Sequence, residues 1–325
     1  MGVVKSIIKG TGSYLPEKIL TNADLEKMVD TTDDWITQRS GIKERHIAAD
    51  DETTGTMAIA AAKRALEAAQ LKPEDIDGVV VATTTPDRTF PAVAVKVQGE
   101  LGIPPGLAFD VQAVCTGFVY ALSVADNFIK MGQAKRIIVI GAEKMSSIID
   151  WNDRTTCVLF ADGAGAVILE AEEVEDNLSS RGIHSTHLYA NGKHRDLLQT
   201  SGGVSTTGDM GKIEMQGREV FKYAVTYMAD VVEETLKENN ITADDIDWLV
   251  PHQANVRIIS ATADKLNLSM DKVVVTVDRH GNTSAASIPL ALDEAVRDGR
   301  IKENDMLLIE AMGGGLTWGS ALVRF

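Results

Sequence analysis

The sequence predicts an α/β fold made of two similar halves, in which largely parallel sheets are covered by helices on both faces. Strand-like apolar runs alternate with amphipathic helical patterns along all 325 residues, as in strand-helix-strand units. The tripeptide Asp-Ile-Asp occurs at 75–77 and again at 245–247, each time between an acidic cap and a short apolar strand. This spacing of 170 residues nearly recurs in the flanking segments, which indicates an internal duplication. Two such halves side by side form five layers, α/β/α/β/α.

Strands and helices alternate through the N-terminal half, which we place at residues 1–175. Alternating apolar residues in the opening stretch VVKSIIKG predict a first strand. Residues 54–70 carry apolar side chains at i, i+3, i+4 and i+7, which is typical of an amphipathic helix. The other predicted elements are strands at 106–114, 134–142 and 155–160, a helix at 115–132 and a tight turn at 162–166.

The C-terminal half, residues 176–325, repeats this layout after an acidic, polar join at 170–182. Its predicted elements are a long amphipathic helix at 218–239, strands at 248–251, 272–278 and 303–311, and a helix at 284–299. The polar, glycine-rich segment 192–211 shows no clear periodicity and is a candidate for the rim of an active site.

The charge balance limits the partners of the chain. Thirty-two basic side chains stand against 47 acidic ones, a net charge of −15, and no run of Lys or Arg is present. Such a chain repels phosphate backbones and anionic lipids, so we expect neither nucleic-acid nor membrane binding, and an acidic partner must meet a local basic patch. Two cysteines do not form a secreted disulfide framework. We therefore expect a cytoplasmic protein without lipid attachment.

Four segments with reactive or hydrogen-bonding residues follow predicted strands. They contain Cys115, His252, Asn282 and the triple glycine Gly313–Gly315. The carboxyl ends of strands in such sheets are where ligands bind. A cysteine on the first turn of a helix should have a lowered thiol pKa. An imidazole, a carboxamide and glycine N–H groups can donate hydrogen bonds to a developing oxyanion. Together they indicate acyl-thioester chemistry.

Each of these signals also has a structural explanation. A cysteine beside apolar residues is commonly a packing residue, and we assign that role to Cys157. His184, His187 and His194 lie close in sequence, but no Cys or acidic residue stands at metal-ligand spacing, so we expect no metal site. We interpret 162–166, DGAGA, as a turn rather than a phosphate-binding loop.

The motifs AVCTGF, PHQAN, GNTSAAS and GGGLTWGSALVRF, with others along nearly the whole chain, resemble the β-ketoacyl-acyl-carrier-protein synthase III family. The combination of PHQAN with GNTSAAS is the specific part, because it provides a Cys-His-Asn set rather than Cys-His-His. The resemblance implies a thiolase-like fold and a homodimer that condenses a short acyl-CoA with malonyl-acyl carrier protein (malonyl-ACP) by a ping-pong sequence, initiating fatty acid synthesis. It also implies that no metal or organic cofactor takes part.

The resemblance further implies residue roles. Cys115 would be acylated, its N–H and that of Gly314 would form the oxyanion hole, and His252 with Asn282 would hold the malonyl thioester oxygen. The implied CoA contacts are Thr31, Trp35, Arg39, Arg154 and Asn255. The implied acyl pocket consists of Leu159, Phe160, Met312 and, across a homodimer, Phe90. Arg257 and Lys222 would bind the acidic acyl carrier protein.

Two residues depart from the usual pattern of the family. Thr116 follows the nucleophile where Ala or Ser is usual, and Met312 stands where Phe usually precedes the triple glycine. Both bear on the width of the acyl pocket. The alternatives are a related polyketide-type starter synthase, a Cys-His-Asn thioester hydrolase and a non-catalytic binding protein of the same fold.

Overall fold

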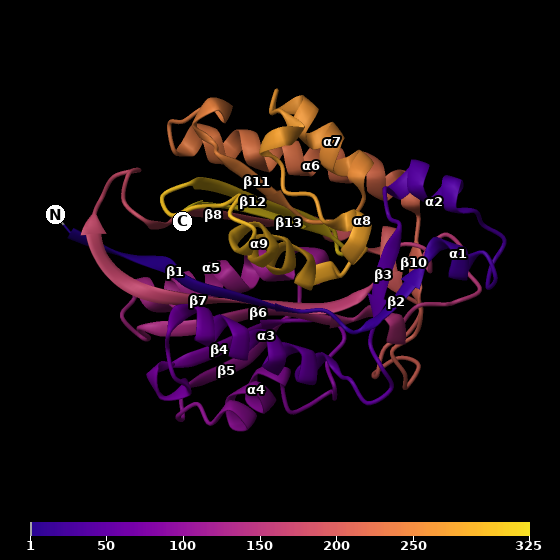
Figure 1. The fold of residues 1–325 in the computed structure, drawn as a ribbon, viewed down its shortest axis with the longest axis horizontal. Coiled ribbons are helices and arrows are strands. Elements are labelled where there is room, and N and C mark those ends of the chain that lie inside the picture. Colours follow the sequence, from indigo (N-terminus) through magenta and orange to yellow (C-terminus); the bar gives the residue numbers. More distant parts are fainter. Residues whose placement is uncertain (1) are drawn as a thin grey trace.

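Residues 2–325, which the computed structural model describes, form two central sheets (Figure 1). The first sheet contains, in spatial order, β1 (Gly2–Tyr14), β7 (Asp162–Glu175), β6 (Arg136–Lys144), β4 (Gly78–Ala82) and β5 (Leu107–Val111). The second contains β11 (Trp248–Pro251), β12 (Met306–Gly313), β13 (Thr317–Arg324) and β8 (Gly182–Ala190). The first sheet is built from residues 2–175 and the second from 182–324, and we keep the division of the chain near residue 175 as a proposal.

Helices cover both faces of each sheet, and the expected five-layer arrangement is present (Figure 1). The outer helices on the first sheet are α3 (Thr54–Ala69) and α4 (Val93–Leu101), those between the sheets are α5 (Gly117–Lys130) and α9 (Ser287–Arg297), and those on the second sheet are α6 (Gly217–Glu238) and α7 (Val256–Lys265). The packing of strand β4 on both faces explains why its sequence is continuously apolar. Val79 and Val81 pack among the residues of α3 and α4, while Val80 and Ala82 pack among those of α5.

Shorter elements complete the fold. They are β2 (Lys18–Thr21), α1 (Asn22–Leu25), α2 (Asp33–Ser40), β3 (Glu44–Ile47), β9 (Leu198–Thr200), β10 (Ile213–Met215) and α8 (Val277–His280). None of the helices formed by residues 2–325 combines the length and apolar character that crossing a bilayer requires.

The duplication is clearest next to the inner helices. A 3-10 turn at Val114–Thr116 precedes α5, and another at Ser284–Ala286, 170 residues later, precedes α9. Both turns begin with a left-handed residue, Val114 at φ 49° and Ser284 at φ 49°. Two copies of one strained connection therefore face each other between the sheets.

The sheets are mixed rather than largely parallel, which corrects the sequence prediction. The parallel pairs are β4 with β5, β4 with β6, and β11 with β12. Only residues 314–316 separate β12 from β13. A connection that short can join only antiparallel strands.

Three local predictions were wrong. Residues 272–278 form no strand beyond a single bridge at Val273, because the Gln253 side chain accepts the backbone N–H groups of Thr276 and Val277 at 2.8 and 3.1 Å. Residues 155–159 form turns rather than a strand, and Phe160 makes only an isolated bridge with Asn282. Segment 162–166 begins β7 rather than forming a turn. Its small residues make room for α9, since a Cβ on Gly165 would lie 2.6 Å from the carbonyl carbon of Pro289.

Candidate active site

Cys115 lies in the 3-10 turn between β5 and α5 and is 3% exposed. The preceding Val114 is a β-branched residue in the left-handed region, which is a strained conformation for such a side chain. Gly313, at the end of β12, packs directly against the turn, because a Cβ there would lie 2.7 Å from the Cys115 backbone nitrogen. The end of β12 thus packs against the Cys115 turn only because Gly313 has no side chain.

Two cavities meet at Cys115. The first, which we call the His252 cavity, contains all three residues of the expected catalytic set; its lining includes Cys115, His252, Asn282, Asn255, Phe221 and Met312. The second, the Gln112 cavity, is lined by Gln112, Val114, Cys115, Met145, Ile148 and Ile213, among others. Phe160 and Leu198 border both cavities. Cys115 therefore lies where the walls of the two cavities meet.

His252 follows β11 and is 2% exposed. Its Nδ1 atom lies 2.6 Å from the Ser287 hydroxyl, so Nε2 is the ring nitrogen left for a ligand. Burial lowers the pKa of His252 to about 3. The imidazole is consequently neutral at physiological pH.

The Asn282 side chain is oriented by its own backbone neighbourhood. Its Oδ1 atom accepts the N–H of Ser284 at 3.0 Å. Its backbone exchanges hydrogen bonds with the segment beside Phe160, donating to the Leu159 carbonyl and accepting from the Ala161 N–H, both at 2.9 Å. Because the oxygen is occupied, the amide NH₂ is the group available to a ligand in the His252 cavity.

Gln253 connects the segments that carry His252 and Asn282. It is completely buried, and its Nε2 donates to the carbonyls of Pro251 and Val274 at 2.9 and 3.0 Å. Its Oε1 accepts the two N–H groups that lead into α8, as described above. All the hydrogen-bonding capacity of a buried amide is thus used to hold β11 and α8 together.

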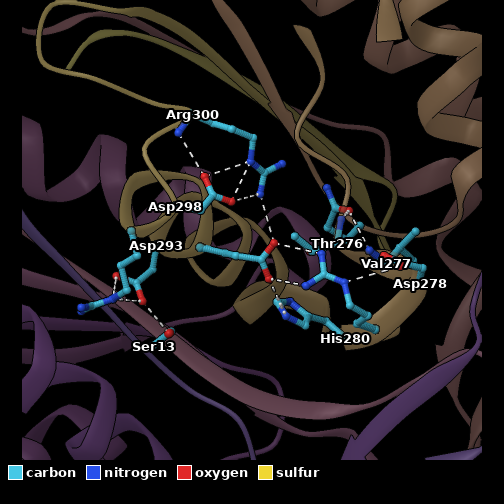
Figure 2. A network of polar contacts seen from close by, with 12 residues as sticks. Ser13, Thr276, Val277, Asp278, His280, Asp293, Asp298 and Arg300 are labelled. Atoms are coloured by element: carbon cyan, nitrogen blue, oxygen red, sulfur yellow. Dashed lines mark hydrogen bonds and ion pairs between the residues drawn. The ribbon is translucent and has the colours of Figure 1, made fainter. Parts of the chain in front are cut away.

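A network of charged side chains connects α8 to α9. Glu294 accepts from both terminal nitrogens of Arg279 at 2.9 Å, lies 3.2 Å from His280 Nε2 and also accepts from Arg300 at 3.0 Å. Figure 2 shows this network around His280, Asp298 and Arg300. Although burial alone would raise it, hydrogen bonds from His280 and Arg279 lower the pKa of Glu294 to about 2. The loop to Asn282 therefore begins from a fixed helix.

The prediction that Cys115 has a lowered thiol pKa was wrong. Burial raises the pKa of Cys115 to about 12, and the charge of Glu143 raises it further, against an opposing contribution from Ser284. Glu143 is itself completely buried, and burial raises its pKa to about 7. The loss of hydration in this enclosed position outweighs the hydrogen bond from Ser284, so the resting cavity holds a neutral thiol and a neutral imidazole.

The residues expected to bind CoA fall into two groups. The Trp35 ring has the guanidinium of Arg39 at 4.9 Å and that of Arg154 at 5.2 Å from its centroid. Asn255 lines the His252 cavity and caps α7, accepting the N–H groups of Arg257 and Ile258. Helices α2 and α7 are in contact, which places the Trp35 cluster beside this helix. The Thr31 hydroxyl is buried without a hydrogen-bond partner among residues 2–325.

The residues expected around the acyl group are only partly together. Leu159, Phe160 and Met312 line the His252 cavity, and Phe160 also lines the other one. Phe90 lines neither cavity and is 82% exposed. The hydroxyl of Thr116 donates to the Thr317 carbonyl at 3.0 Å, and Thr116 borders neither cavity, so it does not narrow them.

Lys222 and Arg257 are exposed on the neighbouring helices α6 and α7. The Arg257 guanidinium lies 5.5 Å from the ring centroid of Phe221, a residue that lines the His252 cavity. Lys222 adjoins this aromatic residue in sequence. The two cations therefore lie near the cavity on an otherwise acidic protein.

Leu198, from segment 192–211 that we expected at the rim of an active site, lines both cavities. Met215, Val220 and Phe221 also line the His252 cavity, and the sequence did not indicate them. Leu198 and Met215 belong to the short strands β9 and β10, whose polar surroundings hide them. Phe221 lies in the apolar stripe of a predicted amphipathic helix, which did not distinguish a cavity wall from core. No group of three or more His, Cys, Asp or Glu residues within 2–325 is placed to hold a metal ion.

Comparison with known proteins identifies the family. Residues 109–192 match the family described as 3-oxoacyl-[acyl-carrier-protein] synthase III, and residues 236–325 match its C-terminal part. A β-ketoacyl-[acyl-carrier-protein] synthase III from Rhodospirillum centenum is 61% identical, covering 99% of each chain.

Solved structures agree with this relationship. The 3-oxoacyl-[acyl-carrier-protein] synthase III of Aquifex aeolicus is 50% identical with a TM-score of 0.92, over 98% of this chain and 100% of that one. The priming β-ketosynthase of the R1128 polyketide biosynthetic pathway is 35% identical with a TM-score of 0.92, over 98% and 96%. The expected fold and enzyme class are thereby confirmed: this chain belongs to the β-ketoacyl-acyl-carrier-protein synthase III family of condensing acyltransferases.

Proposed function

We propose that this enzyme condenses a short acyl-CoA, acetyl-CoA in the first instance, with malonyl-ACP to give 3-ketoacyl-ACP and so initiates fatty acid synthesis. The observation that carries the proposal is that Cys115, His252 and Asn282, far apart in sequence, line one cavity. The names of the full-length relatives give independent support.

In the first half-reaction, the Cys115 sulfur attacks the acyl-CoA carbonyl. The S–C bond to Cys115 forms, the C–S bond to CoA breaks, and the thiol proton leaves on the CoA sulfur. The N–H groups of Cys115 and Gly314 stabilise the oxyanion. Gly313 supports this arrangement because it brings its loop against the Cys115 backbone. We propose the Gln112 cavity as the acyl-chain site, because most of its lining is apolar: Val114, Met145, Ile148, Phe160, Leu198 and Ile213. Its polar lining residues are Thr84, Gln112, Gln199 and Thr200.

In the second half-reaction, the malonyl C–C bond breaks and carbon dioxide leaves. The resulting enolate carbon attacks the acyl-Cys115 carbonyl, a C–C bond forms, and the C–S bond to Cys115 breaks. A solvent proton then restores the thiol. His252 Nε2–H and the Asn282 NH₂ stabilise the enolate oxygen, for which both are free. The scheme uses the two thioesters, a solvent proton, and backbone and side-chain groups of the protein.

We also propose which residues contact the substrates. We propose that adenine lies at the Trp35 cluster, because an indole flanked by planar guanidinium groups suits a flat heterocycle. Thr31 would contribute its unpartnered hydroxyl. We assign Lys222 and Arg257 to the acidic acyl carrier protein. An aromatic ring as exposed as Phe90 supports a homodimer in which it closes the partner's acyl pocket. We propose a cytoplasmic location.

The decisive experiment follows both half-reactions on the purified chain. Incubation with acetyl-CoA should add one acetyl group to a peptide containing Cys115, and subsequent malonyl-ACP should give acetoacetyl-ACP, both detected by mass spectrometry. Cys115→Ala should abolish both products. Release of free acetate without any ketoacyl product would instead identify a thioester hydrolase.

A polyketide-type priming synthase is the second candidate, favoured by the 35% identity to such an enzyme. It would differ in primer or acceptor. A panel of straight and branched acyl-CoAs, each offered with malonyl-ACP and with free malonyl-CoA, separates the two. Preference for a primer other than acetyl-CoA would favour the second candidate.

A further inference from the structure

Ser287 contacts the back of the proposed catalytic histidine. It is the first residue of α9, is 2% exposed and lies on the lining of neither cavity. Its Oγ atom is 2.6 Å from His252 Nδ1 and accepts the backbone N–H of Gln253 at 3.3 Å. A buried hydroxyl with these two partners links the backbone to the imidazole.

The donor and acceptor roles in this link follow from the number of protons. The Gln253 N–H can only donate, so the Ser287 oxygen accepts it. The single hydroxyl proton is then free to go to His252 Nδ1. In the opposite arrangement, Nδ1–H would donate to Ser287, and the buried hydroxyl proton would have no acceptor among residues 2–325, where His252 Nδ1 is the only acceptor within reach. Nδ1 therefore accepts, and the ring proton of a neutral His252 lies on Nε2.

We propose that Ser287 is a positioning residue that fixes the Nε2–H tautomer of His252 and thereby makes the imidazole a hydrogen-bond donor to the substrate oxygen. This inference rests on the proposed function and specifies how the site performs it. The low pKa of His252, caused by burial, keeps the ring neutral, which the assignment requires.

The same device orients the second donor. A backbone N–H, that of Ser284, occupies Asn282 Oδ1 directly. The Gln253 N–H donates to the Ser287 oxygen, and the Ser287 hydroxyl in turn donates to His252 Nδ1. Both donors thus point their remaining N–H groups at the cavity before substrate arrives, a preorganisation that favours the enolate over the starting ester. In this tautomer Nε2 cannot accept the Cys115 proton, in agreement with its departure on CoA.

The test begins with the resting protein. Nitrogen-15 NMR of histidine-labelled enzyme, with the His252 signals assigned from a His252→Asn variant among the six histidines, should show Nε2 protonated and Nδ1 unprotonated at pH 7. In Ser287→Ala, the His252 shifts should move toward a mixture of tautomers, and Ser287→Thr should restore them. An Nδ1–H tautomer in the wild type, or no change in the alanine variant, would refute the proposal.

Kinetics provide the second measurement. Ser287→Ala should reduce malonyl-ACP decarboxylation about 10-fold or more, since one donor is no longer oriented, and change acylation of Cys115 less than threefold. The matched control is Ser123→Ala, which removes a buried hydroxyl on α5 that bonds Thr186 away from both cavities; it should leave both rates unchanged. Equal losses in the two half-reactions of Ser287→Ala would contradict the inference.

The two proposals can fail separately. The NMR measurement needs no substrate, so it decides the tautomer even if condensation is never observed. If Ser287→Ala does not fold, the wild-type spectrum and Ser287→Thr still decide, because an Nδ1–H signal in either refutes the assignment.

Discussion

Removing the Asn282 amide should separate the two half-reactions. Asn282 presents NH₂ to the cavity because Oδ1 is occupied by the Ser284 N–H at 3.0 Å. Loss of one preorganised donor to an oxyanion costs roughly 10²–10³ in rate, or about 2.7–4 kcal/mol of transition-state stabilisation. Asn282→Ala should therefore slow decarboxylation of malonyl-ACP by about 10² or more, while acylation of Cys115 changes little.

The control for this variant is Asn282→Asp. The carboxylate still accepts the Ser284 N–H, so the loop should stay in place, but it has no donor and adds negative charge beside the enolate. We expect it to be at least as inactive as the alanine variant in decarboxylation. Carbon dioxide release and transfer of labelled acetyl from CoA to protein measure the two half-reactions. A variant that loses both rates equally would refute the assignment of Asn282 to the malonyl step.

Three further predictions concern docking, acid stability and thiol reactivity. Arg257→Glu should raise the KM for malonyl-ACP at least 10-fold and that for acetyl-CoA little; equal increases would remove Arg257 from the carrier site. Because the folded pKa of Glu294, about 2, lies below its ordinary value of 4.5, its contribution is present above pH 4.5 and lost as pH falls toward 2. Glu294→Gln should thus cost about 1–2 kcal/mol of unfolding free energy at pH 7, after allowing for solvent screening, and less at pH 3; denaturant unfolding at both pH values checks this, and a cost independent of pH would contradict it. With its pKa raised to about 12, Cys115 should react with iodoacetamide about tenfold faster per pH unit from pH 7 to 10; a plateau below pH 8 in the modified peptide would show a thiolate instead.

Much of the fold follows from the sequence because periodicity and duplication are properties of the chain itself. The buried strand β4 is a continuous apolar run, β6 and β12 are mainly apolar, and α3 and α6 have regular stripes. The predictions fail where a side chain that is distant in sequence determines the local structure. Segment 272–278 reads as a strand, yet the Gln253 amide takes the N–H groups a strand would use. The sequence of 162–166 predicts a turn, yet its glycines allow α9 to pack closely against β7.

The candidate site, like the fold, could be predicted from the sequence only in part. Cys115, His252 and Asn282 could be named from motifs, and the structure places them on one cavity. The ionisation state of Cys115 could not be predicted, because the burial that raises its pKa depends on the whole fold. The link from Gln253 through Ser287 to His252 joins residues 34 to 35 positions apart in sequence. No local pattern connects them.

The paired left-handed turns at Val114 and Ser284 have a consequence for how the protein can change. One copy carries Cys115, and the other copy is in contact with it between the sheets. Neither segment of an ancestral repeat can therefore be exchanged alone. A chimera that takes one half from a distant homologue should form the same layers and still lose turnover, because the Val114 and Ser284 turns must come from the same protein to fit each other.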